Sequence, residues 1–414
     1  MIVAPEPHHE LPRSILDQDL YKFLMQHAVR EHYPDVHVQY MFINRDKGQR
    51  LNEPAFRWLQ QRIIEREYLE TTCCPFLPKR YFDYLSQFRF DPENQVSMEF
   101  SDCDKDSLRL TVSGRWADVI LYEIPLLSLI SEAYFKFVDT DWNYDGQMSK
   151  AREKGMYLIR GGCSFAEFGT RRRRDFHTQY LVIKSLLGLP PGRGRLVGTS
   201  NVYLARHFDI PASGTVGHEW TMGIAAIEGT YENGNSLALR KWHDTFGGHL
   251  GIALTDTFGS KAFFANFDHD LATKYRGVRH DSGDPFEFIE TVKRHYQGLG
   301  IDPTSKIIVF SDGLNPETAV RLQSACQDAG VGCSFGIGTN FTNDFVARSD
   351  PARTSLAMNI VIKLVKCNDK FCVKLSDVKT KHTGDPQEVL RAQYELGMYN
   401  VLERVFESVD SRYQ

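Results

Sequence analysis

One short stretch of the chain places an arginine and two carboxylates close together. It reads Arg279-His280-Asp281-Ser282-Gly283-Asp284. Carboxylates bind ribose hydroxyls or Mg²⁺, and a guanidinium pairs with phosphate or diphosphate. The stretch could also be no more than the start of a helix, with Asp281 or Ser282 as its N-cap. Both interpretations stay open, and the first makes Arg279 and Asp281 candidate site residues.

A histidine follows a run of small residues near the middle of the chain. His218 comes after Thr215-Val216-Gly217 and is followed by Glu219. A single histidine is more often structural than catalytic. At the end of a strand, with a carboxylate beside it, a histidine can also serve as a nucleophile or a general base. The sequence leaves both roles of His218 open.

Four consecutive arginines, Arg171 to Arg174, follow Phe168-Gly169-Thr170. A guanidinium binds a carboxylate or phosphate through two parallel hydrogen bonds, so Arg171, nearest the preceding strand, is the expected anion clamp. At least two of the other three arginines are expected to be solvated or to lie at an interface. A patch for RNA or for nuclear import is the alternative, which is disfavoured because no further basic run flanks the four arginines.

Two glycine-containing loops are suited to a phosphate. Gly313 follows Ser311-Asp312, and Gly336-Ile337-Gly338 precedes Thr339. Backbone N–H groups at helix N-termini bind anions when no side chain is in the way, so these loops could hold a sugar phosphate. The alternative is that each glycine merely closes a tight turn. The second loop lacks the third glycine of a dinucleotide fingerprint, and the sequence has no Walker A motif.

These loops come after short apolar segments that each lead into a helical pattern. The repeat of strand and helix predicts an α/β fold with a TIM-like barrel, in which the polar residues at the strand C-termini meet on one face. A doubly wound open sheet is the competing arrangement. The expected strands are at 163–168, 195–197, 210–214, 251–254, 275–278, 306–310 and 332–335.

The N-terminal part of the chain predicts a smaller α/β domain over residues 1–150. Ser14 is the expected cap of a helix that runs to about His32. Residues 359–365 read as a strand that returns to this region, so the domain is expected to be discontinuous: it is completed by about 345–414, and the barrel spans 151–344. The other expected elements are a strand at 36–43, helices within 52–90, a strand at 108–112 and a long helix at 117–137.

Composition limits the class of protein. The chain has 414 residues, of which 42% are apolar and 25% charged, and its net charge of −4 disfavours nucleic acid as a main partner. The eight cysteines show no zinc-binding spacing and indicate reduced thiols. The most apolar run, 119–135, contains Glu123, Pro125 and Glu132, so it predicts a buried helix and not a membrane span. Residues 1–13 show no secretory signal. We therefore expect a cytoplasmic protein, with the nucleus as a second compartment.

Taken in order along nearly the whole chain, nine stretches resemble the nicotinate phosphoribosyltransferase family, of the fungal and bacterial type. Any one stretch is a weak match, but the occurrence of all nine in this order is highly specific. One is Gly214-Thr215-Val216-Gly217-His218-Glu219-Trp220. The others are at 16–22, 121–127, 167–173, 198–201, 254–256, 281–285, 335–339 and 359–364.

The resemblance implies an irregular TIM-like βα barrel packed against a discontinuous N-terminal α/β domain, in a homodimer. It implies an enzyme that joins nicotinate to 5-phosphoribosyl 1-diphosphate, giving nicotinate mononucleotide and pyrophosphate. ATP would be consumed, Mg²⁺ would be required, and the reaction would be the entry to NAD salvage from nicotinate (the Preiss–Handler pathway).

The resemblance also assigns roles to single residues. His218 matches the histidine that ATP phosphorylates transiently. Tyr21 of a partner subunit and Phe168 match the aromatic pair that encloses the pyridine ring. Arg171 and Arg279 match arginines that bind anions.

Further positions match substrate contacts. Thr215 corresponds to a nicotinate contact and Thr339 to a phosphate contact. Asp256 and Asp281 match acids near the ribose, the pyrophosphate or Mg²⁺. The remaining expected substrate contacts are Ser200, Asp312, Gly313, Gly336 and Gly338.

Ser200 decides between this family and its nearest rival. In the similar nicotinamide phosphoribosyltransferases an acidic residue is expected at this position, where it would accept a hydrogen bond from the amide. An acid there would repel the carboxylate of nicotinate by about 1–4 kcal/mol at ~4 Å. Ser200 therefore favours nicotinate. Quinolinate phosphoribosyltransferase shares the fold, and the chain is long for it. A protein of another class, an RNA-binding barrel using Arg171 to Arg174, is the remaining alternative.

Overall fold

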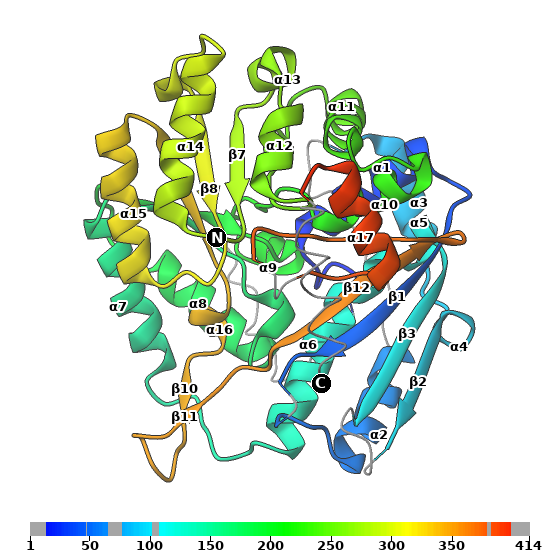
Figure 1. Cartoon of the computed structure of the whole chain (residues 1–414). Helices are drawn as coiled ribbons and strands as arrows, with labels where there is room; N and C mark the ends of the chain where they lie inside the picture. The colour runs from blue at the N-terminus through cyan, green and yellow to red at the C-terminus, as the bar shows by residue number, and fades with distance from the viewer. Residues whose placement is uncertain (1–13, 47, 65–76, 102–106, 379–381, 399–414) are drawn as a thin grey trace, which may run out of the picture.

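The computed structural model describes residues 14–46, 48–64, 77–101, 107–378 and 382–398 (Figure 1). Within these residues the chain forms one antiparallel and one parallel sheet, each with its own helices, and a separate two-stranded ribbon. The expected α/β class is confirmed. Residues 1–13, together with Cys73, Cys74 and Cys103, lie outside the described residues, and the five described cysteines are free thiols.

The antiparallel sheet is built from two distant parts of the chain. Its strands are β1 (His37–Asn44), β2 (Val96–Phe100), β3 (Leu108–Arg115), β12 (Ile360–Cys367) and β13 (Lys370–Phe371), in the order β13-β12-β1-β3-β2. β12 pairs with β1 from Cys367 opposite Val38 to Ile360 opposite Asn44. The expected return of residues 359–365 to the first region is confirmed, whereas the domain bounds themselves stay a prediction.

One face of this sheet packs against the core, because alternate residues of β1 are buried. Val38, Tyr40 and Phe42 are buried, and Met41 between them is 45% exposed. The helix expected within 117–137 is interrupted by a 3-10 turn at Ile120–Tyr122, and the part that follows it is largely buried, as predicted. No helix in the described part of the chain is both long enough and apolar enough for a bilayer span. The helices are α1 (Leu20–His32), α2 (Glu53–Ile64), α3 (Lys79–Gln87), α4 (Pro92–Gln95), α5 (Trp116–Val119) and α6 (Glu123–Phe137).

The first helix begins later than predicted. Ser14 is not its cap, because α1 starts at Leu20 with Asp19 in the cap position. The preceding residues form turns whose backbone bonds to the barrel side: Val202 N donates to Gln18 O at 2.9 Å, and Leu20 N donates to Ser200 O at 2.8 Å. These contacts place the start of α1 beside the parallel sheet.

The parallel sheet contains six of the seven expected strands. No strand forms at 210–214, where a single parallel bridge joins Ala212 to Thr199. Pro211 lacks an N–H group, so this segment cannot donate at that position of a ladder. The result is an irregular version of the expected βα arrangement. The strands are β4 (Ser164–Glu167), β5 (Arg195–Thr199), β6 (Ile252–Leu254), β7 (Gly277–His280), β8 (Ile307–Phe310) and β9 (Gly332–Ile337), in the order β5-β4-β9-β8-β7-β6.

Helices surround the parallel strands (Figure 1). The C-terminal part of the described chain joins them, since Val373 and Leu375 are buried in one cluster with Phe258 and Ala392. The helices are α7 (Gln147–Arg160), α8 (Phe176–Leu187), α9 (Val202–His207), α10 (His218–Glu228), α11 (Gly234–Phe246), α12 (Ser260–Asn266), α13 (His269–Lys274), α14 (Pro285–Gly298), α15 (Pro316–Ala329), α16 (Thr339–Thr342) and α17 (Pro386–Glu395), with 3-10 turns at Thr170–Arg172 and Pro303–Ser305 and the ribbon strands β10 (Phe345–Val346) and β11 (Thr354–Ser355).

Candidate active site

The candidate active site lies where three neighbouring parallel strands end. Asp256 follows β6, Asp281 directly follows β7, and Ser311 directly follows β8. The carboxyl ends of parallel strands meet at one edge of their sheet, which is where α/β proteins bind ligands. The sequence prediction that Asp256 and Asp281 converge is confirmed, and His218 lies between them.

His218 is the first residue of α10 and is paired with a buried carboxylate. Its Nε2 lies 2.7 Å from Asp256 Oδ1 and 3.7 Å from Asp281 Oδ2. Asp256 is fully buried, and its other oxygen accepts a hydrogen bond from Ser282 and pairs with Lys374 Nζ at 3.1 Å. Burial lowers the pKa of His218, which Asp256 partly offsets. The pKa of Asp256 stays well below its usual value, because His218 and Lys374 outweigh the effect of burial.

Arg279 ties four segments together at this edge. Its Nη1 donates to Thr215 Oγ1 at 2.9 Å and to Val216 O at 3.1 Å, its Nε donates to Ser311 Oγ at 2.7 Å, and its Nη2 donates to Asp281 Oδ1 at 2.9 Å. Burial would raise the pKa of Asp281, but Arg279 and His218 hold it below its usual value, so Asp281 is ionised. Thr215, His218 and the two acids therefore form one network.

The alternative explanation of the stretch at 279–284, a helix cap at Asp281 or Ser282, is wrong. The cap of α14 is Asp284, whose carboxylate accepts hydrogen bonds from Phe286 N and Glu287 N. Since Asp284 serves the helix, Asp281 and Ser282 are free to bond to Arg279 and Asp256.

Two aromatic side chains that the sequence analysis singled out lie against glycines of the barrel domain. Tyr21 of α1 lies against Gly217, where a Cβ atom would be 3.2 Å from the Tyr21 ring. Phe168 follows β4, and its ring fills the space that a side chain at Gly336 would need. Both residues are partly exposed. This Tyr21 contacts Gly217 of its own chain, and the expected contribution of Tyr21 across a subunit interface stays a prediction.

Two models of one protein family together match most of the chain. The family model described as "Nicotinate phosphoribosyltransferase (NAPRTase) family" matches residues 163–398, and the model of the N-terminal domain of the same family matches residues 16–131. The chain belongs to the nicotinate phosphoribosyltransferase family.

Relatives of this family match over most of their length. A Schizosaccharomyces pombe relative is 47% identical over 400 residues, which cover 92% of this chain and 97% of the relative. The nicotinate phosphoribosyltransferase of Saccharomyces cerevisiae is 42% identical over 407 residues, which cover 93% and 95%. The crystal structure of the Porphyromonas gingivalis nicotinate phosphoribosyltransferase has a TM-score of 0.87 at 36% identity and covers 94% of this chain and 100% of its own.

The arginines at 171–174 differ in burial from the sequence prediction. The side chain of Arg171 is 43% exposed, and its Nη1 lies 3.8 Å from Glu123 Oε1. Arg173 and Arg174 are fully buried, and neither is solvated. Arg173 binds both oxygens of Asp17, at 2.7 and 2.6 Å, and Arg174 stacks over the Phe135 ring at 3.6 Å. The run therefore does not form the basic patch of an RNA-binding protein.

The glycine loops lie at the same edge of the sheet. Gly338 approaches Phe168 O so closely that a Cβ atom would be 2.9 Å away, which explains glycine there without a ligand. Gly313 adopts a φ of +56°, which glycine favours, and it is exposed with Asp312 next to Ser311. Thr339 begins α16. Phosphate binding by these residues stays a prediction.

Ser200 is hydrogen-bonded to Asp19, an acid that the sequence analysis did not single out. Its hydroxyl donates to Asp19 Oδ1 at 2.6 Å, and both residues are buried. Burial raises the pKa of Asp19, and hydrogen bonds with Ser200 and Thr170 partly offset this. The signal was present, because Asp19 lies two positions before Tyr21 in a stretch that resembles the family. A buried carboxyl group thus stands beside Ser200 after all.

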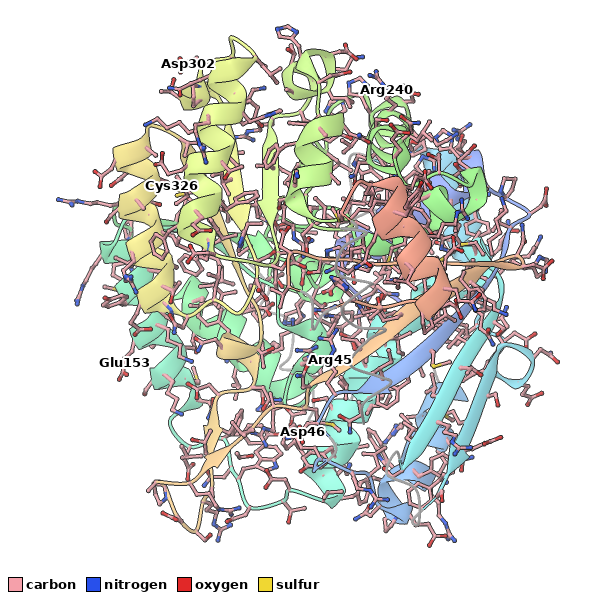
Figure 2. The ribbon with its side chains drawn as sticks, viewed as in Figure 1. Arg45, Asp46, Glu153, Arg240, Asp302 and Cys326 are labelled. Carbon is pink, nitrogen blue, oxygen red and sulfur yellow. The ribbon has the colours of Figure 1, made fainter. Side chains whose placement is uncertain are left out.

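Three cations near Arg171, namely Lys363, Lys374 and Arg45, were also missed. Burial and the nearby charges of Lys374, Arg45 and Arg171 lower the pKa of Lys363 to about 7, with Glu123 acting in the opposite direction. Arg45, labelled in Figure 2, directly follows the end of β1 and is exposed. Lys374 joins this group to the Asp256–His218 pair. Mutual repulsion of this kind is relieved by a polyanion, which marks the four residues as candidates for binding phosphates. They come from four separate segments, so no local pattern reveals them.

The donor set fits Mg²⁺ only in part. His218, Asp256 and Asp281 can each offer one atom, and these three atoms lie within 4.8 Å of one another. Mg²⁺ prefers oxygen ligands and usually reaches proteins through one or two carboxylates together with substrate phosphates. Asp256 is already bonded to His218, Ser282 and Lys374. Asp281 accepts its bonds from Arg279 and Ser311 on Oδ1, and its Oδ2 lies 3.7 Å from His218 Nε2. Through Oδ2, Asp281 is therefore the carboxylate better suited to a Mg²⁺ ion that arrives with a diphosphate.

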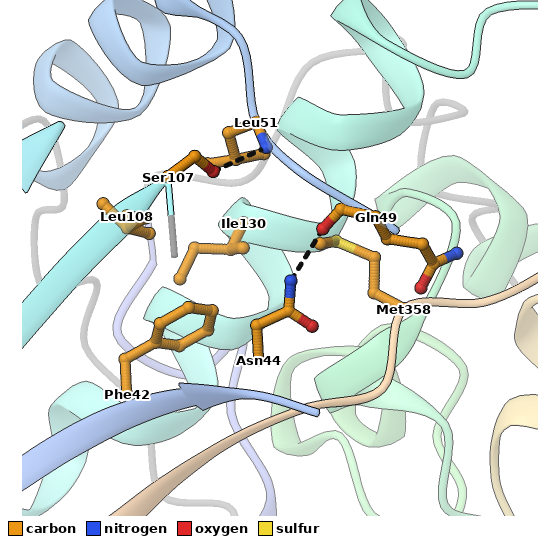
Figure 3. Close-up of a pocket in the computed structure, with 8 residues that line it drawn as sticks. All are labelled: Phe42, Asn44, Gln49, Leu51, Ser107, Leu108, Ile130 and Met358. Atoms are coloured by element: carbon orange, nitrogen blue, oxygen red, sulfur yellow. Dashed lines mark hydrogen bonds between the residues drawn. The ribbon is translucent and has the colours of Figure 1, made fainter. Parts of the chain in front are cut away.

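A separate cavity contains none of the candidate site residues (Figure 3). It lies between β1, β3 and α6, and its walls are bonded to each other: Asn44 Nδ2 donates to Gln49 O at 2.6 Å, and Leu51 N donates to Ser107 Oγ at 3.1 Å. It is lined by Phe42, Asn44, Gln49, Leu51, Ser107, Leu108, Ile130 and Met358.

Proposed function

We propose that the protein is a nicotinate phosphoribosyltransferase, which joins nicotinate to 5-phosphoribosyl 1-diphosphate and releases nicotinate mononucleotide and pyrophosphate. The observation that carries this proposal is the network at the strand ends, in which Arg279, Asp281, Asp256 and His218 are bonded together. Family membership supports the same activity, which provides the entry to NAD biosynthesis from nicotinate.

Nicotinate is a flat anion, and the site offers what such a ligand needs. Tyr21 and Phe168 provide aromatic faces, and Arg171 provides a partly exposed guanidinium that pairs with a carboxylate. Thr215 Oγ1 accepts a hydrogen bond from Arg279 Nη1, and it belongs to the same loop as Gly217, which lies against Tyr21. We assign these four residues to nicotinate.

Transfer breaks the bond from ribose C1 to the diphosphate oxygen and forms a bond from C1 to the pyridine nitrogen. Positive charge develops on the ribose and negative charge on the leaving diphosphate. The carboxylate of Asp281, ionised in the structure, stabilises the first charge. Lys363, Lys374 and Arg45 are placed to stabilise the second. Mg²⁺, when bound with the diphosphate near Asp281, would neutralise part of its charge.

We further propose that ATP is consumed through phosphorylation of His218. Asp256 bonds to Nε2, which leaves Nδ1 as the nitrogen with a free lone pair. Attack by Nδ1 on the γ-phosphorus forms an N–P bond and breaks the bond to the β-phosphate oxygen, releasing ADP. Burial favours the neutral, nucleophilic imidazole. Hydrolysis of the phosphohistidine then returns His218 and phosphate, so ATP drives a change between two binding states.

Nicotinamide is the second candidate substrate, and one observation favours it. The Asp19 carboxyl group beside Ser200 could accept a hydrogen bond from an amide. Its raised pKa weakens this argument, because a protonated acid tolerates a carboxylate nearby.

Product analysis by mass spectrometry separates the two substrates. The enzyme is incubated with 5-phosphoribosyl 1-diphosphate, Mg²⁺ and ATP, together with either nicotinate or nicotinamide. We expect nicotinate mononucleotide and a kcat/KM for nicotinate at least 100-fold above that for nicotinamide. Equal values, or product from nicotinamide alone, would overturn the assignment.

A further inference from the structure

A buried ion pair lies directly behind the site. Lys22 of α1 is fully buried, and its Nζ lies 2.5 Å from Glu219 Oε2 and 2.5 Å from Glu123 Oε2. Glu219 Oε1 accepts hydrogen bonds from Trp116 Nε1, at 2.7 Å, and from the Tyr40 hydroxyl. A buried charge is tolerated only when it is paired and hydrogen-bonded. One glutamate therefore joins α1, β1 and α5 to the first turn of α10.

The chain order makes this pair more than a packing feature. Lys22 is adjacent to Tyr21, whose ring borders the site, and Glu219 is adjacent to His218, which pairs with Asp256. α1 holds the same loop at a second point, because Gly217 N donates to Met25 Sδ at 3.3 Å. A rotation of α10 that broke the bonds of Glu219 would also move His218.

We propose that Lys22 and Glu219 are positioning residues that fix His218 relative to Tyr21. The inference rests on the proposed function and adds that the phosphate-accepting histidine and the nicotinate-binding ring are held by one ion pair. Such a link would let a change at His218 reach the ring site through two adjacent residues of α1. Displacements of about 1 Å at a reacting group already cost large factors in rate.

Glu219→Gln tests this pair, because the amide keeps an oxygen for Trp116 and Tyr40 but loses the charge that binds Lys22. Glu228→Gln is the matched control. Glu228 ends the same helix, accepts a hydrogen bond from the Tyr33 hydroxyl at 2.8 Å and lies 3.8 Å from Lys241 Nζ, far along α10 from His218. A third variant, Lys22→Met with Glu219→Gln, removes both charges of the pair, while Glu123 keeps Arg171 Nη1 at 3.8 Å as a cation. It guards against a folding defect in the single variant.

Two readouts are compared. The first is the stimulation of nicotinate mononucleotide formation by ATP, which we expect to fall at least 10-fold in Glu219→Gln and to stay within twofold in Glu228→Gln. The second needs no ATP: diethyl pyrocarbonate modifies neutral imidazoles, and its rate at His218 is measured by peptide mass spectrometry against the exposed His269. We expect a rate at least fivefold higher in Glu219→Gln, because His218 is released from Asp256.

The two readouts distinguish failure of the inference from failure of the proposed function. If the wild-type enzyme shows no ATP stimulation, the ATP step is wrong, and the His218 modification rate alone decides the inference. If diethyl pyrocarbonate modifies His218 at the wild-type rate in Glu219→Gln or in the folded double variant, the positioning role is overturned. Equal changes in Glu219→Gln and Glu228→Gln would likewise overturn it, because they would reflect general loosening of α10.

Discussion

His218 Nε2 lies 2.7 Å from the fully buried Asp256 Oδ1, and the opposite oxygen of Asp256 pairs with Lys374 Nζ at 3.1 Å. A carboxylate held between a histidine and a lysine keeps its negative charge and fixes which imidazole nitrogen it binds. The same lysine belongs to the cations around Lys363. The proposed nucleophile and the proposed phosphate-binding residues are therefore linked through one acid.

Arg173→Met is expected to lower the stability of the protein, and Arg171→Met is expected to weaken nicotinate binding. Arg173→Met leaves Asp17 buried without its cation, so unfolding free energy should fall by about 3–5 kcal/mol. Arg171→Met removes a partly exposed guanidinium, so stability should change little while the KM for nicotinate rises about 10-fold or more. Urea denaturation and steady-state kinetics measure both. A stable Arg173→Met enzyme would contradict the structure.

Binding of 5-phosphoribosyl 1-diphosphate is expected to take up a proton above neutral pH. The pKa of Lys363 is about 7 in the free enzyme, so the amine is largely neutral at pH 8. A bound polyanion raises that pKa towards its ordinary value near 10.4, so uptake should approach one proton at pH 8 and vanish near pH 6. Isothermal titration calorimetry in two buffers of different ionisation enthalpy measures the uptake.

Lys363→Gln and Lys366→Gln provide the comparison for this experiment. Both residues lie on β12, and Lys366 lies over the Phe371 ring, away from the cation group. Lys363→Gln should abolish the proton uptake and raise the KM for the diphosphate about 10-fold at pH 6.5. Lys366→Gln should behave as the wild type. Unchanged uptake in Lys363→Gln would assign the proton to another group.

Tyr21 is expected to act within its own subunit. Complementation tests this: Tyr21→Ala and His218→Ala are co-expressed with different tags, and the mixed species is isolated. Because Tyr21 and Gly217 of one chain are in contact, every site in a mixed assembly carries one defect, and activity should not recover. If Tyr21 served a partner subunit in a homodimer, the isolated mixed species would carry one intact site and one site with both defects, so about half of wild-type activity would return.

Ser200→Asp is expected to impair use of nicotinate in a pH-dependent way. The new carboxyl group would stand within hydrogen-bonding distance of Asp19, whose pKa burial already raises. Two such acids share a proton at low pH and lose it as pH rises, which adds negative charge beside the nicotinate carboxylate. The kcat/KM for nicotinate should fall about 10-fold at pH 6 and further at pH 8. Ser200→Thr, which keeps a hydroxyl, is the control.

The sequence predicted those parts of the site that local pattern encodes. Asp256 and Asp281 follow apolar strands, and parallel strands bring their ends together, so their convergence follows from topology. The fates of Arg173 and Arg174 could not be predicted, because their partners Asp17 and Ser355 lie more than 150 positions away in the chain. The missing strand at 210–214 and the late start of α1 have the same origin, since distant hydrogen bonds override local propensity.

The central claim is tested most directly by the ATP dependence of nicotinate mononucleotide formation in the wild type, His218→Ala and Asp256→Asn. The account predicts ATP stimulation and a labile phosphohistidine on the His218 peptide in the wild type. In His218→Ala it predicts slow transfer that ATP does not accelerate, and in Asp256→Asn a stimulation reduced about 100-fold. Full coupling of ATP hydrolysis to product formation in His218→Ala would contradict it.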